Sequence, residues 1–120
     1  MNQLKYTLYF IPECSKCRGS LNLLEKFDEN LLKKINYVEN PPNEEELKKI
    51  SSIIDGGFTS LLREDSLKNL QKENTEINLN RVLKLILNDP KSNLQRPIFI
   101  NWEKNLAVVA RPVEKINDLL

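Results

Sequence analysis

The sequence contains no histidine, and this absence excludes several kinds of catalysis. A Ser-His-Asp triad and a Cys-His protease pair both need an imidazole as the general base. Proton transfers in this chain therefore fall to water, carboxylates or thiols. Glycine is also scarce: Gly19, Gly56 and Gly57 form no glycine-rich loop of the kind that binds nucleotides.

Strong net charge and long apolar runs are missing as well. Among 120 residues, 18 basic and 17 acidic side chains leave a formal net charge of +1, so no direct nucleic-acid partner is expected. No apolar run approaches the roughly twenty residues that span a bilayer, and Asn2, Gln3 and Lys5 leave no apolar targeting core. We expect a monomer of one domain, residues 1–120, located in the cytoplasm and away from membranes.

The chain has two cysteines, Cys14 and Cys17, which lie three residues apart. The segment Tyr6–Ile11 before them is rich in β-branched and aromatic residues, which is typical of a buried strand, and Pro12 ends it. A helical pattern follows, so Cys14 falls where a strand gives way to a helix. The apolar side chains predicted on that helix are Cys17, Leu21, Leu23, Leu24 and Phe27.

The position of Cys14 favours its thiolate form. Unpaired N–H groups and the positive end of the dipole lie at a helix N-terminus, and Lys16 and Arg18 add positive charge nearby. A thiol with a pKa of about 8.5 is only about 3% ionised at pH 7, so a lower pKa greatly increases the reactive fraction. Cys14 is therefore the predicted nucleophile, with Lys16 and Arg18 as thiolate-stabilising residues.

Two cysteines at this spacing also occur in zinc sites and in structural disulfides. Zinc is disfavoured because a closed four-ligand site would need carboxylates or a second chain, so we expect no metal. A permanent structural disulfide is disfavoured because so short a loop would constrain the unfolded chain little. For Cys17, a redox role and a place in the core as a buried thiol are almost equally favoured, because it shares an apolar stripe with Leu21 and Leu24.

The remaining elements follow in the order strand, helical region, two strands and helix. A short strand is predicted over Lys34–Val38, and the apolar runs Pro97–Ile100 and Leu106–Val109 are typical of a hairpin. The order β-α-β, helical insertion at about 41–93, then β-β-α predicts an α/β, thioredoxin-like fold with a four-stranded mixed sheet. Helices are expected after Asn43, after Asn78 and from Pro112, with one or two short helical turns between Phe58 and Thr75.

Three arginines, Arg63, Arg96 and Arg111, lie beside apolar or proline-containing segments rather than among the scattered lysines. A guanidinium group is a planar, permanently charged fork that binds tetrahedral oxyanions bidentately. Taken singly, each arginine is better accounted for by a weak surface salt bridge. Together with a nucleophilic thiol, they are the predicted binding residues for a small oxyanion substrate.

Five short motifs occur in a specific order along the chain. They are Cys14-Ser15-Lys16-Cys17-Arg18, Glu39-Asn40-Pro41-Pro42, Leu61-Leu62-Arg63, Gln95-Arg96-Pro97-Ile98 and Arg111-Pro112-Val113-Glu114. In this order they resemble the glutaredoxin-coupled arsenate reductase family nearly end to end. The resemblance implies that Cys14 attacks arsenate bound by the three arginines and that Pro97 is a cis proline facing Cys14. It also implies glutathione and glutaredoxin as electron donors, with no bound cofactor.

The chain departs from that family at two places. Members often have a histidine and an asparagine four and three residues before the nucleophile, where this chain has Phe10 and Ile11. Many arsenate-reducing members also lack Cys17, which makes the motif similar to that of the Spx-type regulators, which carry a CxxC redox switch and bind a protein partner. As a resolving thiol, Cys17 would form a disulfide that thioredoxin or glutaredoxin reduces. The reductase interpretation is favoured because Spx-type proteins generally lack the Arg111-Pro112 pair, and a redox-sensing regulator is the alternative.

Overall fold

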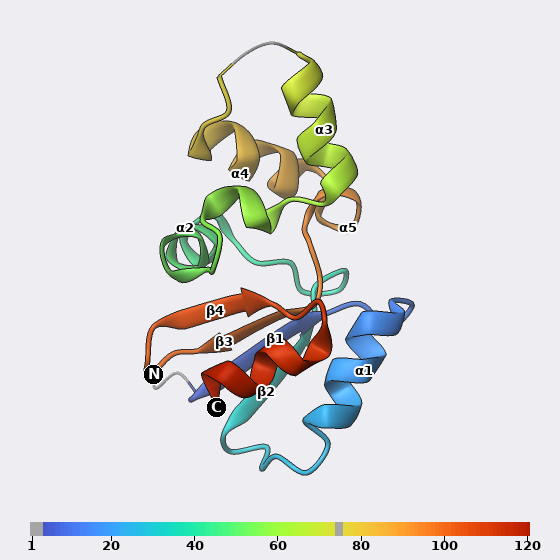
Figure 1. Ribbon diagram of the computed structural model, residues 1–120, viewed down its shortest axis with the longest axis vertical. Coiled ribbons are helices and arrows are strands. Elements are labelled where there is room, and N and C mark those ends of the chain that lie inside the picture. The colour runs from blue at the N-terminus through green and yellow to red at the C-terminus, as the bar shows by residue number, and fades with distance from the viewer. Residues whose placement is uncertain (1–3, 74–75) are drawn as a thin grey trace.

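The protein folds around a mixed four-stranded sheet, described by a computed structural model over residues 4–73 and 76–120 (Figure 1). The strands are β1 (Tyr6–Phe10), β2 (Leu32–Asn36), β3 (Ile98–Asn101) and β4 (Leu106–Val109). Their order in the sheet is β2-β1-β3-β4, with β1 parallel to β2, β1 antiparallel to β3, and β3 antiparallel to β4. The predicted α/β class with a four-stranded mixed sheet is therefore confirmed.

Helices cover both faces of the sheet. On one face, α1 (Ser15–Leu23) packs beside the 3-10 helix η2 (Val113–Leu119). The helices between β2 and β3 all fall within residues 41–93, and Figure 1 shows them gathered at the end of the long axis opposite α1. This helical insertion comprises α2 (Glu44–Ile53), the 3-10 helix η1 (Phe58–Leu61), α3 (Glu64–Lys72), α4 (Leu79–Asn88) and α5 (Pro90–Asn93).

Two hydrophobic clusters lie on opposite faces of the sheet because successive strand residues point to opposite sides. Leu8 and Phe99 pack in the cluster beneath α1 and η2, whereas their neighbours Tyr9 and Ile98 pack against the insertion. All four residues of β3 are buried, as expected for a strand covered on both faces. The insertion contributes Leu47, Ile50, Leu61, Val82, Leu83 and Ile86 to its cluster.

The helix starts predicted in the insertion are confirmed by their caps. Asn43 and Glu46 form a reciprocal capping box at the start of α2. At the start of α4, the Asn78 side chain accepts a hydrogen bond from the backbone N–H of Arg81. Between them, the short turns expected from Phe58 onward are more regular than predicted, because η1 is followed by the nine residues of α3. Asn2, Gln3 and the end of that stretch, residues 74–75, lie outside the described residues.

Two predicted elements need correction. The second strand lies two residues earlier than expected, since the Asn36 side chain accepts the backbone N–H of Val38 and turns the chain there. Tyr37 is consequently a buried residue beyond the strand. The last element is a 3-10 helix rather than an α-helix: its apolar residues Val113, Ile116 and Leu119 recur every three residues, which matches three residues per turn.

The first helix also ends sooner than its apolar pattern predicted. Leu24 caps it, and Leu23, expected on the apolar face, is 40% exposed. Cys17 and Leu24 were expected on one stripe, yet they belong to different clusters. Cys17 packs with the insertion side of the sheet, and Leu24 packs beneath η2. The first turn of α1 therefore points toward the insertion.

Candidate active site

Cys14 is the N-cap residue of α1, with an extended backbone that leaves its side chain facing the first turn. Its Sγ accepts a hydrogen bond from the backbone N–H of Cys17 at 3.3 Å. The preceding turn is closed by the Cys14 N–H, which donates to the carbonyl of Ile11. The thiol is half-buried, so a small substrate can reach it. Sequence and structure agree that this residue lies at a helix N-terminus.

The surroundings of Cys14 lower its pKa overall. Partial burial raises the pKa, but hydrogen bonds from the Cys17 thiol and from the N–H groups of Cys17 and Lys16 lower it, as does the charge of Arg111. The net result is a pKa below the usual range for a thiol. A lower pKa means a larger thiolate fraction near neutral pH, which is what nucleophilic chemistry requires.

Cys17, one helical turn later, has the opposite environment. Its side chain is 0% exposed and belongs to the cluster between the sheet and the insertion. Burial, together with the hydrogen bond to Cys14 and the nearby negative charge of its thiolate, raises the pKa of Cys17 to about 12. Both thiols are free. Cys17 is thus a neutral donor to Cys14 in the reduced protein.

Arg111 is the arginine that contacts the nucleophile. Its Nη2 donates to Cys14 Sγ across 3.9 Å, and its Nε donates to the carbonyl of Arg96 at 2.8 Å. Arg111 closely follows the end of β4, where Ala110 N–H bonds to the carbonyl of Pro97. The hairpin therefore holds a positive charge directly over the first turn of α1.

Arg63 and Arg96 complete the group, and Gln95 connects them. Arg63 Nη1 donates to Gln95 Oε1 at 3.1 Å, and the same oxygen accepts the Arg96 backbone N–H at 3.3 Å. The guanidinium of Arg96 donates to the carbonyls of Lys91 and Leu94 (2.7 and 3.3 Å). Burial and the nearby charges of Arg96 and Arg111 lower the pKa of Arg63.

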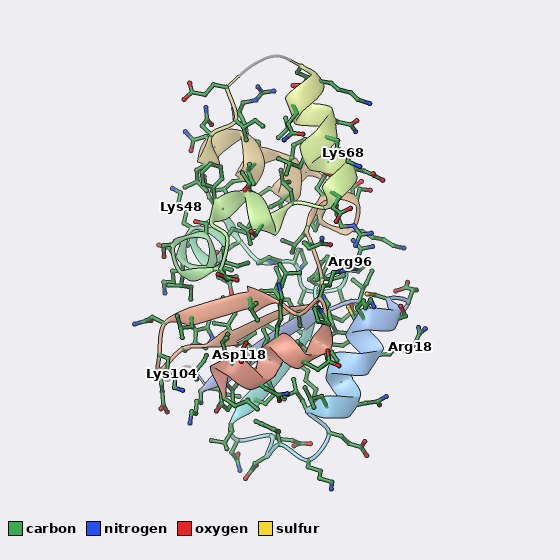
Figure 2. The ribbon with its side chains drawn as sticks, viewed as in Figure 1. Arg18, Lys48, Lys68, Arg96, Lys104 and Asp118 are labelled. Carbon is green, nitrogen blue, oxygen red and sulfur yellow. The ribbon has the colours of Figure 1, made fainter. Side chains whose placement is uncertain are left out.

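A pocket of about 160 Å³ lies beside this group and is lined by Arg63, Glu64, Asp65, Gln95 and Arg111. Figure 2 places Arg96 where the segment after α5 reaches the sheet, between the insertion and α1. A larger hollow of about 380 Å³ between β4 and η2 contains neither a thiol nor an arginine. Two of the three arginines line the small pocket, which makes it the candidate site for an oxyanion.

The remaining predicted residues lie around this centre in different ways. The Arg96–Pro97 peptide bond is cis, and Pro97 is buried immediately before β3. Lys16 contributes to Cys14 through its backbone N–H, while its side chain is exposed. Arg18 is directed at the loop before the nucleophile, where its Nη1 donates to the carbonyls of Pro12 and Glu13, each at 3.2 Å.

Two residues at the site were not predicted from the sequence. Gln95 lies within one of the five motifs, but its contacts with Arg63 and Arg96 become visible only in three dimensions. Tyr37 is fully buried, and its hydroxyl donates to the carbonyl of Leu94 at 2.8 Å, which fixes the chain just before Gln95. For Gln95 the sequence signal was a polar residue next to Arg96, and such a signal is not specific.

Two properties of the described residues bear on the class of site. Within residues 4–73 and 76–120, no group of three or more acidic, cysteine or histidine side chains is arranged to hold a metal ion. Across the same part of the chain, none of the helices has the length and apolarity needed to cross a bilayer.

Comparison with known proteins identifies the family. The sequence model of the ArsC family matches residues 9–119. The chain belongs to the ArsC family. Because the match begins in β1 and ends in η2, it includes both cysteines, the insertion and all three arginines.

The proteins that the chain is similar to include both an enzyme and a regulator. The chain is similar to an arsenate reductase from Vibrio cholerae, with 26% identity and a TM-score of 0.74 over 99% of this chain and 100% of that one. A structure from Yersinia pestis matches with 28% identity and a TM-score of 0.75 over 94% and 98% of the two chains. The regulatory protein MgsR of Bacillus subtilis is 33% identical over 114 residues, or 90% of this chain and 85% of MgsR. The thioredoxin-like ArsC fold predicted from the motifs is confirmed.

Proposed function

We propose that the protein is a thiol-dependent oxidoreductase in which Cys14 attacks an arsenate ion bound by Arg63, Arg96 and Arg111. The observation that carries this proposal is the contact between Arg111 Nη2 and Cys14 Sγ, at 3.9 Å. It joins a half-buried thiol of lowered pKa to a cluster of three permanent cations. An arsenate reductase of the same fold supports the choice of oxyanion.

In the first step, Cys14 Sγ attacks the arsenic atom of arsenate. A sulfur–arsenic bond forms and one arsenic–oxygen bond breaks; the oxygen takes up protons from solvent and leaves as water. Arsenic stays in its +5 state, because substitution alone transfers no electrons. The arginines offset the negative charge that the thiolate must approach, which is their expected contribution to the rate.

In the second step, another thiolate attacks Cys14 Sγ. A disulfide bond forms, the sulfur–arsenic bond breaks, and its electron pair remains on arsenic. Two sulfurs are thereby oxidised by two electrons in total, arsenic is reduced to the +3 state, and arsenite is released. The attacking thiol is either glutathione or Cys17, whose thiol is hydrogen-bonded to Cys14 in the reduced protein.

The two routes leave different disulfides. Glutathione would leave a mixed disulfide on Cys14, which glutaredoxin reduces, whereas Cys17 would leave an intrachain disulfide, which thioredoxin or glutaredoxin reduces. Burial raises the pKa of Cys17 to about 12, so its thiolate is disfavoured while Cys14 is charged. Conversion of the Cys14 thiolate into an uncharged adduct sulfur removes the part of that penalty due to charge repulsion.

The reaction is tested by measuring arsenite formation with purified reduced protein, arsenate, and either glutathione with glutaredoxin or thioredoxin with its reductase. Turnover with either donor supports the proposal, and the effect of replacing Cys17 identifies the attacking thiol. Cys17→Ser is the matched variant: it should abolish turnover supported by thioredoxin and spare turnover supported by glutathione. Absence of arsenite with both donors, in protein whose Cys14 is reduced and accessible to alkylation, would rule out arsenate reduction.

A second candidate function is a redox-sensing regulator that binds a protein partner. It is favoured by the 33% identity with the regulatory protein MgsR and by the placement of Cys17 directly behind an accessible Cys14. Oxidation to a Cys14–Cys17 disulfide would remove the thiolate that Arg111 contacts and so change the surface near the start of α1. Partner binding would then depend on the oxidation state.

The regulator hypothesis predicts different partners for the oxidised and the reduced protein, without arsenite formation. Affinity capture from cell extract in each state, followed by mass spectrometry, measures this directly. Cys17→Ser is again the matched variant, because it cannot form the disulfide and should show the reduced pattern in both conditions. Identical sets of partners for wild type in the two states would count against a switch.

A further inference from the structure

Gln95 is a buried polar residue at the junction between the insertion and the sheet. Its side chain is 9% exposed, and its backbone N–H donates to the carbonyl of Leu61 at 2.7 Å. The carboxamide oxygen accepts two hydrogen bonds, from Arg63 Nη1 and from the Arg96 backbone N–H. One side-chain oxygen therefore ties an arginine of the insertion to the strand that follows.

Arg63 needs such an acceptor more than its two companions do. It comes from the insertion as the N-cap residue of α3, whereas Arg96 and Arg111 flank the β3–β4 hairpin and bond to backbone carbonyls. Like charges in one small site repel each other. A neutral oxygen holds the Arg63 guanidinium in place and leaves its charge uncancelled, whereas a carboxylate in the same position would cancel it.

Competing partners lie close to Arg63. Glu64 and Asp65 follow it in sequence and line the same pocket of about 160 Å³, and both side chains are exposed. An arginine released from Gln95 has these carboxylates as alternative acceptors. In that position its charge would be engaged in an ion pair at the rim and withdrawn from an incoming anion.

We infer that Gln95 is a positioning residue that directs the Arg63 guanidinium at the oxyanion, an inference that rests on the proposed function. It acts through Arg63 and is not expected to contact the reacting atoms. The Cys14 thiolate should depend on it less, because the hydrogen bonds of the Gln95 side chain go to Arg63 and to the Arg96 backbone, and Gln95 reaches Arg111 only through that backbone.

The test is a double-mutant cycle on oxyanion affinity. Arsenate and sulfate are titrated separately as protectants of Cys14 against iodoacetamide, in wild type, Gln95→Met, Arg63→Ala and the double variant. Gln95→Met should weaken protection by about tenfold, the effect of losing a hydrogen bond to a charged group. In the Arg63→Ala background the same change should have a much smaller effect, limited to the lost acceptor of the Arg96 N–H, since Gln95 acts on the anion mainly through Arg63. Gln71→Met is the matched control, because Gln71 is exposed on α3.

The remaining outcomes are also decisive. Equal protection in wild type and Gln95→Met would overturn the inference, and so would additive losses in the cycle. A shift in the pH profile of Cys14 alkylation that accounts for the whole loss of protection would overturn it too. Should Gln95→Met fail to fold, Gln95→Asn replaces it, because its shorter side chain withdraws the acceptor from Arg63. Protection without any turnover would defeat arsenate reduction and leave the role of Gln95 standing. If neither anion protects wild-type Cys14, both proposals fall.

Discussion

Cys14 and Cys17 occupy the first turn of one helix, yet the protein gives them opposite properties. Cys14 caps the helix, is contacted by Arg111 and has a lowered pKa; Cys17 faces the core, is 0% exposed and has a pKa raised to about 12. The residue type and the helix are the same, so the difference comes from what each side chain faces. One helical turn therefore separates a nucleophilic thiol from a thiol that stays protonated.

The largest effect is expected from exchanging each thiol in turn. Cys14→Ser should abolish arsenite formation with every donor, because the described site contains no other accessible thiol. Cys17→Ser should retain turnover supported by glutathione and glutaredoxin. The measurement is the rate of arsenite formation for both variants side by side, and substantial turnover in Cys14→Ser would refute the assignment of the nucleophile.

The next effect comes from the charge that distinguishes the two environments. Arg111→Ala should raise the pKa of Cys14 and weaken arsenate protection by about 10- to 100-fold, as expected for a lost hydrogen bond to a charged group. Lys16→Ala is the matched control, since the backbone N–H that serves Cys14 is retained in it. The pH dependence of alkylation reports the first effect and arsenate titration the second. An equal response of Lys16→Ala and Arg111→Ala would mean that general charge, rather than the contact at 3.9 Å, controls the thiol.

Stability should depend on pH with opposite sign for the two thiols. The folded pKa of Cys14 is lowered, so its contribution is present above the unfolded value of about 8.5 and is lost as the pH falls through the folded value. The folded pKa of Cys17 is raised, so its contribution is present below about 8.5 and is lost as the pH rises toward 12.

Urea unfolding at several pH values checks these signs. Relative to Cys14→Ser, wild type should gain stability as the pH rises toward about 8.5; relative to Cys17→Ala, it should lose stability above that value. Slopes of the same sign for both comparisons would contradict opposite pKa shifts.

The smallest effect tests whether the contrast between the thiols is local. Asn43→Ala removes the cap of α2, on the insertion side of the sheet, and should lower the free energy of unfolding by about 1 kcal/mol. Alkylation of Cys14 and protection of Cys17 should stay unchanged at temperatures where the variant is folded. A shifted pH profile for Cys14 would show that the thiols depend on the insertion as a whole.

Features decided within a few residues were predictable from the sequence. The caps at Asn43 and Asn78, the hairpin before Arg111 and the position of Cys14 at a helix start all follow from local patterns. The thioredoxin-like order of elements followed from combining them. The two misjudged boundaries, at Leu23 and at Asn36, lie where a turn competes with an apolar pattern.

Contacts between residues that are distant in sequence could not be predicted from local patterns. The Arg111–Cys14 contact joins positions 97 apart, and the bond between Arg63 and Gln95 joins positions 32 apart. The sequence indicated three arginines as candidate binding residues, but not which of them contacts the sulfur of Cys14. Arg18, close to Cys14 in sequence, is instead directed at the loop carbonyls of Pro12 and Glu13. Proximity along the chain was therefore a poor guide to electrostatics at the thiol.

The division of roles between the thiols is tested most directly by the rate of alkylation of each one as a function of pH in native, reduced protein, with the two sites separated by mass spectrometry. Cys14 should react with a midpoint below about 8.5, the value for an ordinary thiol, while Cys17 stays unmodified until much higher pH or until the protein unfolds. A Cys14 midpoint at or above that value, or equal labelling of both thiols near neutral pH, would contradict this division.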